Sequence, residues 1–413
     1  MLRPALLLAA TLALPPLAAA QEDPALRHAR ELLNRVPLVD GHNDLPWLVR
    51  EYAGGDLARY DLRTHTPNET DLARLAEGEL AGQFWSVWIP SVDSGSARLQ
   101  LEQIELARRL IAAYPDRLAF ATRAADIATA KQAGKIASFL GMENGRGIEN
   151  SLGALRACYE LGVRYMTLTH GRDTDWADSA TDVPRLGGLS PFGREVVREM
   201  NRLGMLVDIS HVSPDVMRQV LDVSEAPVIF SHSSARAVTD HPRNVPDDVL
   251  RRMPANGGVV MVSFIPSFVS TRVMEWGKPI EAVLQGLTEI KDFERVEKER
   301  ESVAGPQPRA TIADVADHID HVAKVAGADH VGIGSDFAGV KMPLGLEDVS
   351  RYPYLFAELV RRGWSDEALA KLAGGNLVRA MSRAETVAAR LQRERPASNA
   401  TIEELDRKPA PAK

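Results

Sequence analysis

The chain has 413 residues and a formal net charge of −7, from 49 basic and 56 acidic side chains. Hydrophobic residues make up 45% of it and charged residues 25%, a composition that excludes a disordered or fibrous protein. The acidic balance argues against nucleic acid as a partner, because that interaction needs a clustered basic surface. The single cysteine, Cys158, excludes an intrachain disulfide and a multi-cysteine zinc site.

The first 20 residues have the pattern of a secretory signal peptide. Arg3 precedes an apolar run, and Ala18-Ala19-Ala20 provides a small-residue cleavage site before Gln21. We therefore expect export to the periplasm or to the outside of the cell; an N-terminal membrane anchor is the alternative. No later segment approaches the ~20 apolar residues of a transmembrane helix, so we expect no membrane anchor in the mature protein.

Short apolar runs, rich in β-branched or aromatic residues, recur along the chain as candidate strands. They are residues 37–40, 83–89, 135–141, 164–169, 205–209, 227–230, 258–264 and 330–334. Stretches with a helical pattern lie between most of them, at 97–113, 151–161, 193–203, 214–223 and 312–325. This alternation predicts a parallel sheet. Eight strands fit an α/β fold of the (β/α)8 TIM barrel type, and a long open doubly wound sheet is the alternative.

Two segments depart from this rhythm. Residues 271–308 are highly charged and end in Gly305-Pro306-Gln307-Pro308, so we predict a helical insertion after the seventh strand. Residues 391–413 are rich in Pro, Ala and charge, which predicts a disordered tail. The barrel domain itself is expected to span residues 21–390.

Histidines and carboxylates follow six of the predicted strands directly. They are His42 and Asp44 after the first, Glu143 after the third, His170 after the fourth, His211 after the fifth, His232 after the sixth and Asp336 after the eighth. In a TIM barrel all these positions meet at the C-terminal face, where active sites of this fold lie.

Imidazoles and carboxylates without thiolates suit zinc or another divalent transition metal. The set is too large for one tetrahedral ion and fits two ions that share a carboxylate, with a hydroxide between them, as in two-metal hydrolytic sites. Ordinary roles are also open: Asp44 or Asp336 could cap a following helix, and Glu143 could be a surface carboxylate.

Three further polar residues have less specific surroundings. His318 and His321 lie three apart in a predicted helix, and we interpret them as ordinary residues of its polar face. Arg243 lies close behind the sixth strand. It could bind a substrate carboxylate near the metals with its forked guanidinium, or form a structural salt bridge.

Longer ordered strings surround these residues: 40–47 (DGHNDLPW), 82–87 (GQFWSV), 165–170 (YMTLTH), 176–178 (WAD), 208–211 (DISH), 231–233 (SHS), 243–248 (RNVPDD) and 334–337 (GSDF). Through them the chain resembles the membrane (renal) dipeptidases, the M19 metallopeptidases of the amidohydrolase-like superfamily. The matching strings span residues 35–385, nearly the whole predicted mature chain.

The resemblance implies a TIM barrel with two zinc ions per chain. His42 and Asp44 would hold one ion, His211 and His232 the other, and Glu143 would bridge them. One departure concerns the family's Asp-Phe-Asp-Gly after the last strand. It stands here as residues 336–339 (DFAG), which we interpret as the loss of a carboxylate near the metals.

The resemblance also implies the reaction, zinc-dependent hydrolysis of dipeptides by a metal-bridging hydroxide, as in membrane dipeptidase (EC 3.4.13.19). His170 would contact the scissile carbonyl, Arg243 would bind the free carboxylate, and Asp336 would accept and return the proton. L,D-dipeptides and β-lactam-like dehydropeptides could be side substrates. The partner is a small dipeptide, and the protein could also form a homodimer, because the sequence leaves the oligomeric state open. The alternatives are another amidohydrolase, such as an N-acyl-D-amino acid hydrolase, and a non-catalytic degenerate barrel.

Overall fold

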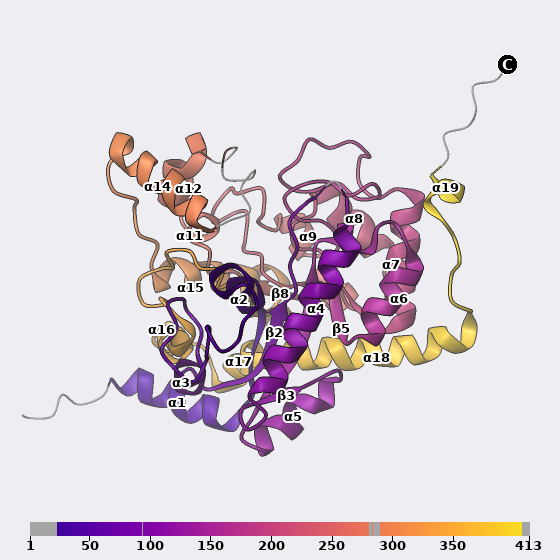
Figure 1. The fold of residues 1–413 in the computed structure, drawn as a ribbon. Coiled ribbons are helices and arrows are strands. Elements are labelled where there is room, and N and C mark those ends of the chain that lie inside the picture. The colour runs from indigo at the N-terminus through magenta and orange to yellow at the C-terminus, as the bar shows by residue number, and fades with distance from the viewer. Residues whose placement is uncertain (1–22, 93, 281–282, 284–289, 407–413) are drawn as a thin grey trace, which may run out of the picture.

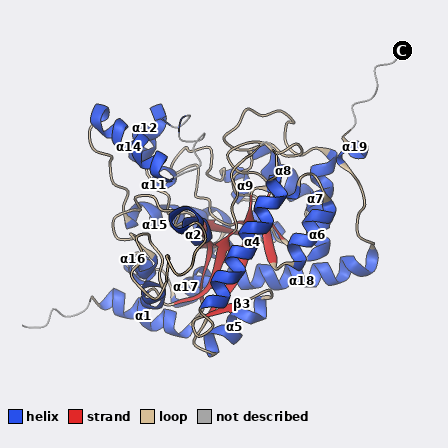
Figure 2. Ribbon diagram, viewed as in Figure 1, coloured by secondary structure: helices blue, strands red, loops and turns tan. Residues whose placement is uncertain are grey.

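A ring of parallel strands lies at the centre of the structure (Figure 2). The computed structural model describes residues 23–92, 94–280, 283 and 290–406; the predicted signal peptide lies outside them. The ring is formed by β1 (Leu38–Asn43), β2 (Leu80–Ser86), β4 (Ile136–Glu143), β5 (Val163–Thr167), β6 (Leu206–Asp208), β7 (Ile229–Phe230), β8 (Val259–Val262) and β9 (Val331–Ile333). β2 pairs with both β1 and β4, and β9 pairs with both β8 and β1, so the barrel closes. The predicted TIM barrel is therefore confirmed, and the open sheet is excluded.

One further strand, β3 (Leu118–Phe120), was not predicted. It pairs in parallel with residues 136–138 of β4, and β5 pairs with residues 140–143 of the same strand. With three residues and an exposed Phe120, it has neither the length nor the burial pattern that identifies a strand in sequence.

Helices surround the barrel (Figure 1). They are α1 (Pro24–Arg35), α2 (Leu45–Ala53), α3 (Leu72–Glu77), α4 (Ser96–Ala113), α5 (Ala124–Gln132), α6 (Leu152–Glu160), α7 (Pro191–Leu203), α8 (Pro214–Val223), α9 (Asp247–Leu250), α10 (Met253–Asn256), α11 (Pro266–Val269), α12 (Thr271–Gly277), α14 (Ile290–Ala304), α15 (Ile312–Ala326), α16 (Tyr352–Arg361), α17 (Asp366–Ala370), α18 (Asn376–Glu394) and α19 (Ile402–Leu405). Local signals explain several starts: Ser190 and Ser213 cap α7 and α8, and a proline follows each cap. No helix in the described part of the chain is long and apolar enough to span a bilayer.

Large side chains fill the barrel below its C-terminal end: Val39, Phe84, Phe139, Tyr165 and Met261. Two glycines make room for them. A Cβ at Gly141 would lie 2.0 Å from the Tyr165 ring, and one at Gly41 would lie 2.5 Å from the Met261 sulfur. The opposite end of the barrel is covered by α18, which contributes Leu377 and Met381 to the same cluster. The barrel is thus a packed core with a solid floor under its C-terminal face.

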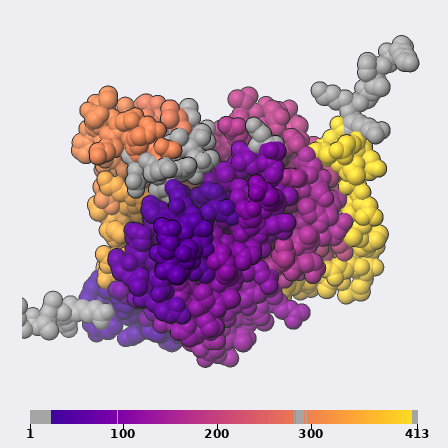
Figure 3. Space-filling model, viewed as in Figure 1, coloured from indigo at the N-terminus to yellow at the C-terminus, as the bar shows by residue number. Residues whose placement is uncertain are grey.

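The two unusual segments have different outcomes. Between β8 and α15 the chain forms α12 and α14, which lie at the end of the molecule opposite β3 and stand out in orange in Figure 3. The prediction of a disordered tail from residue 391 is wrong as far as Asp406. There α18 continues to Glu394, and Asp406 accepts hydrogen bonds from the Ser190 hydroxyl and the Phe192 amide of α7. Residues 407–413 lie outside the described part.

Candidate metal centre

The histidines and carboxylates predicted to form the site converge around Glu143, at the end of β4. One of its oxygens, Oε2, lies 3.3 Å from His42 Nε2. The other, Oε1, lies 2.9 Å from His211 Nε2 and 3.4 Å from His232 Nε2. Glu143 is 3% exposed, so the alternative of a surface carboxylate is wrong. One oxygen thus faces His42, and the other faces His211 and His232.

Asp44 and Asp336 complete the side of the cluster that contains His42. His42 Nε2 lies 3.5 Å from Asp44 Oδ1 and 3.9 Å from Asp336 Oδ1. Asp44 precedes α2, yet its side chain makes no capping hydrogen bond, and no helix follows Asp336 directly. The helix-cap alternative therefore fails for both residues.

Several donor atoms of this cluster are buried and lack a hydrogen-bond partner among the described residues. They are His42 Nε2, His232 Nε2 and Asp44 Oδ1. A buried polar atom without a partner is costly, and a bound cation would satisfy all three. Neutral imidazoles with carboxylates are the donors that divalent transition metals prefer. The residues present therefore fit a metal site, and Glu143 belongs to two of the three ligand groups that the geometry allows.

The proton on His232 can be located from its neighbours. Ser231 donates its hydroxyl to Asp208 Oδ2 at 2.5 Å, so the Ser231 oxygen is left to accept from His232 Nδ1, 2.7 Å away. His232 therefore carries its proton on Nδ1 and keeps a lone pair on Nε2, as a metal ligand must. His42 is held in a similar way, with Nδ1 2.8 Å from the Tyr165 hydroxyl.

Asp208 and Asp40, neither of which was given a role from sequence, occupy equivalent positions below the cluster. Asp208 accepts hydrogen bonds from the backbone and the hydroxyl of Ser231, which precedes His232. Asp40 accepts the same pair from Ser335, which precedes Asp336. The sequence signal that could have pointed to these two aspartates was the serine directly before His232 and before Asp336. Its meaning depends on which strands are neighbours, and no single segment reveals that.

Asp336 is buried beside other carboxylates. Burial, with the negative charges of Asp44 and Glu143 adding to it and His42 opposing it, raises the pKa of Asp336 to about 7. Its backbone adopts φ +65°, a left-handed conformation that is uncommon for a residue other than glycine. The adjoining amide donates to the His42 carbonyl, which fixes this turn against β1.

Arg243 is buried close to the cluster, and no carboxylate of the described residues lies within ion-pair distance of its guanidinium. Its Nη1 and Nη2 atoms lie 3.4 Å from the Ser233 hydroxyl and the His232 carbonyl, and Nε has no hydrogen-bond partner. Burial lowers the pKa of Arg243 to about 10. Within the described ranges no carboxylate forms an ion pair with it, so the structural salt bridge is not found. A buried guanidinium with a free donor is suited to binding an anion.

His170 is the most accessible histidine of the cluster, with 28% of its side chain exposed and Nε2 3.7 Å from Glu143 Oε1. Its ring lies 4.3 Å from that of His211 and 5.4 Å from that of Trp88. It can therefore contact both the cluster and a molecule that approaches from solvent.

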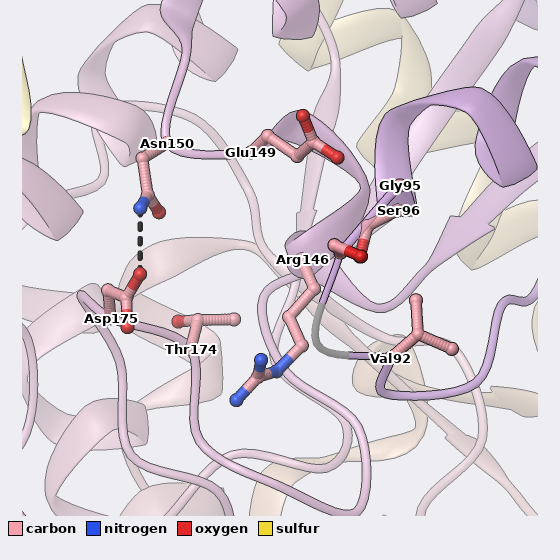
Figure 4. A pocket seen from close by; sticks show the side chains of 9 residues that line it. Val92, Gly95, Ser96, Arg146, Glu149, Asn150, Thr174 and Asp175 are labelled. Atoms are coloured by element: carbon pink, nitrogen blue, oxygen red, sulfur yellow. Dashed lines mark hydrogen bonds between the residues drawn. The ribbon is translucent and has the colours of Figure 1, made fainter.

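A cavity of about 340 Å³ lies beside the loops that follow β2, β4 and β5 (Figure 4). Arg146 lines the cavity, and Asn150, which also lines it, donates a hydrogen bond to Asp175. None of the predicted site residues lines this cavity, so the candidate metal centre is identified by its donor atoms and not by this hollow.

Fold and cluster together define a TIM-barrel protein with the donor set of a metallohydrolase. A model of the membrane dipeptidase family, peptidase family M19, matches residues 26–395. The chain belongs to this family.

Individual relatives agree with that assignment. Dipeptidase 3 of Mus musculus is 42% identical over 374 residues, which cover 88% of this chain and 68% of the mouse protein. An uncharacterized dipeptidase of Schizosaccharomyces pombe is 43% identical over 371 residues, covering 86% of this chain and 82% of the yeast protein.

Solved structures are also similar. The probable dipeptidase PvdM of Pseudomonas aeruginosa has a TM-score of 0.76 at 26% identity, over 88% of this chain and 99% of its own. A metallopeptidase of Rhodobacter sphaeroides, solved with a phosphinate mimic of the dipeptide L-Ala-D-Ala, has a TM-score of 0.69 at 26% identity, over 84% of this chain and 99% of its own. The chain is thus an enzyme of a metallopeptidase family, and the family implies a metal cofactor.

Ser231→Ala should weaken metal binding, because His232 would lose the acceptor that keeps its proton on Nδ1. Losing such a supporting hydrogen bond typically costs about 10–100-fold in metal affinity. Metal content after dialysis against a graded chelator measures this. Ser138→Ala, which removes a buried hydroxyl near the start of β4, is the control. Equal metal retention by both variants would contradict the role of Ser231.

Proposed function

We propose that the protein is a zinc-dependent dipeptidase of the membrane dipeptidase type (EC 3.4.13.19). The observation that carries this proposal is the pairing of the metal-ligand cluster with Arg243. A buried guanidinium that contacts the His232 carbonyl and keeps an unpartnered Nε favours a substrate whose free carboxylate lies close to the scissile bond. The family assignment supports the same reaction.

Glu143 is the residue best suited to be shared by two zinc ions. His42 and Asp44 would hold the first ion with Glu143 Oε2, and His211 and His232 the second with Glu143 Oε1. The ions, when bound, would lower the pKa of water and polarise the scissile carbonyl.

The remaining roles belong to side chains around the substrate. Arg243 binds its carboxylate with the forked guanidinium. Asp336 accepts the proton of the attacking water on Oδ1 and passes it to the nitrogen of the leaving amine. A buried carboxylate beside the cluster can serve first as the base and then as the acid. His170 donates to the oxygen of the carbonyl as negative charge develops there.

Stereochemistry and location follow as parts of the proposal. The Rhodobacter sphaeroides metallopeptidase binds a mimic of L-Ala-D-Ala, which supports L,D-dipeptides as substrates beside L,L-dipeptides. β-Lactam-like dehydropeptides remain proposed side substrates. The pattern of residues 1–20 supports export to the periplasm or beyond. A panel of L,L- and L,D-dipeptides against N-acyl-D-amino acids tests the reaction, and turnover of only the N-acyl compounds would overturn it.

The active protein should contain two zinc ions per chain, and Glu143→Gln should reduce both metal content and activity, because an amide is a poor bridge between cations. Glu149→Gln, on the loop beside the cavity, is the matched control. Elemental analysis of the two variants and the wild type decides the matter. One ion or none in fully active protein would contradict the two-ion site, and a loss of activity alone would make Glu143 an acid instead of a ligand.

Arg243→Leu should raise KM for free-acid dipeptides strongly, with a loss of roughly 2–5 kcal/mol in binding, because the substrate carboxylate would lose its charged partner. A dipeptide amide should be a poor substrate for the wild type and no worse for the variant. Arg251→Leu, which removes an exposed guanidinium paired with Asp247, is the control. Equal cleavage of acid and amide by the wild type would refute the assignment.

Asp336→Asn should retain its metal and lose about 10²–10⁴-fold in kcat, because an amide can bind the water but cannot take its proton. Asp329→Asn, on the surface beside Lys371, controls for the loss of one negative charge. Zinc content, Tm and kcat are measured on the same preparation. Near-normal kcat in fully loaded Asp336→Asn would assign the proton transfer to another residue, and a loss of zinc would make Asp336 a ligand.

A further inference from the structure

His318 is completely buried, and its interpretation as an ordinary residue on the polar face of a helix is wrong. It lies on α15, and the loop after β7 covers the helix at this point. Both ring nitrogens have partners. Nδ1 accepts a hydrogen bond from the Ala235 amide at 2.9 Å, and Nε2 lies 3.2 Å from the Val269 carbonyl.

These partners determine the protonation of the ring. A backbone amide can only donate, so Nδ1 of His318 must hold a lone pair and Nε2 must carry the proton. Nε2 then donates to the Val269 carbonyl and also lies 3.4 Å from the Thr239 hydroxyl. Burial lowers the pKa of His318 to about 4, so the ring stays neutral and keeps this arrangement at neutral pH.

Of the two segments that His318 joins, one contains Arg243 and the other contacts it. Ala235 belongs to residues 233–245, which we call the Arg243 arm. Val269 ends α11, and the neighbouring Phe268 places its ring 5.2 Å from the guanidinium carbon of Arg243. The Phe268 carbonyl also accepts a hydrogen bond from Asn244 at 2.7 Å. The guanidinium is thus held between the end of β7 and α11.

We propose that His318 is a positioning residue for the substrate carboxylate. By bonding to the Arg243 arm and to α11 at once, it fixes the distance between them and so the place of the guanidinium relative to the metal ligands. This inference rests on the proposed carboxylate-binding role of Arg243. His318 makes no hydrogen bond to any of the proposed metal ligands, so its effect should be on substrate binding and not on metal content.

Three variants separate the two bonds. His318→Asn retains an acceptor near the Nδ1 position for Ala235, His318→Gln retains a donor near the Nε2 position for Val269, and His318→Leu retains neither. The control is His330→Gln. His330 is also buried and bonded through Nδ1 to a backbone carbonyl, that of Gly258, but it stands at the start of β9, at the far end of the barrel.

Each variant is assayed as the full metal-loaded protein on one dipeptide and on its C-terminal amide, with zinc content and Tm. His318→Leu should raise KM for the free acid about 10-fold, in keeping with the cost of a small misplacement of a binding group. Its kcat should change by less than about 2-fold, and its zinc content and its KM for the amide should not change. The KM values of His318→Asn and His318→Gln for the free acid should lie between those of His318→Leu and the wild type. His330→Gln should lower Tm without altering the ratio of acid to amide.

Combination with Arg243→Leu tests whether His318 acts through Arg243. In that background His318→Leu should have no further effect on KM, because residues that act through one interaction are not additive. A wild type that does not distinguish acid from amide would refute the role of Arg243 itself. If the wild type prefers the free acid and the folded His318 variants keep the same preference, the positioning role alone is refuted. If His318→Leu does not fold, His318→Asn and His318→Gln test the proposal by the same ratio of free-acid to amide cleavage. A loss of zinc in these two variants that parallels their loss of activity would also refute the positioning role.

Discussion

Two buried aspartates hold together the strand ends on which the candidate metal centre depends. Asp208 and Asp40 each accept both the backbone and the hydroxyl hydrogen bonds of a serine on a neighbouring strand. Each aspartate thereby fixes the position of the residue that follows the serine. This residue is His232 beside Asp208 and Asp336 beside Asp40. Buried charges are tolerated because their acceptor sites are filled. The two aspartates therefore hold the end of β7 against β6 and the end of β9 against β1.

The cluster of charged and polar residues above the two aspartates destabilises the fold. Three carboxylates and several histidines share a space largely closed to water, and some of their nitrogen and oxygen atoms have no hydrogen-bond partner in the described part of the chain. Two site residues, His211 and Asp336, also adopt positive φ angles. Such conformations and unpaired groups cost stability and persist only where the surrounding structure enforces them. The packed floor of the barrel, with Tyr165 under His42, supplies that rigidity.

The sequence was informative where function and secondary structure coincide. His42, His211 and His232 were recognisable because each lies at the end of a buried strand or a few residues beyond it, and the barrel brings all strand ends to one face. Tertiary packing decided the rest. His318 has a helical pattern around it like any polar-face residue, and only the course of the loop after β7 makes it buried. Asp406 looked like part of a disordered tail because its partners lie on α7, about 215 residues earlier in the chain.

In the proposed function, the residues that would hold the metal and the residue that would bind the substrate carboxylate stand on different parts of the fold. The proposed metal ligands stand on strands or directly behind them, where the closed barrel and the two aspartates leave little freedom. Arg243 stands instead on an arm fixed by contacts with α11 and α15, outside the barrel wall. If Arg243 binds the substrate carboxylate as proposed, changes in α11 would move the guanidinium, and with it the substrate preference, with less effect on the residues proposed as metal ligands. In a TIM barrel this is how loops vary specificity over a constant reaction centre. Phe268, whose ring lies 5.2 Å from the guanidinium carbon of Arg243, is the residue of α11 at which that variation would act most directly.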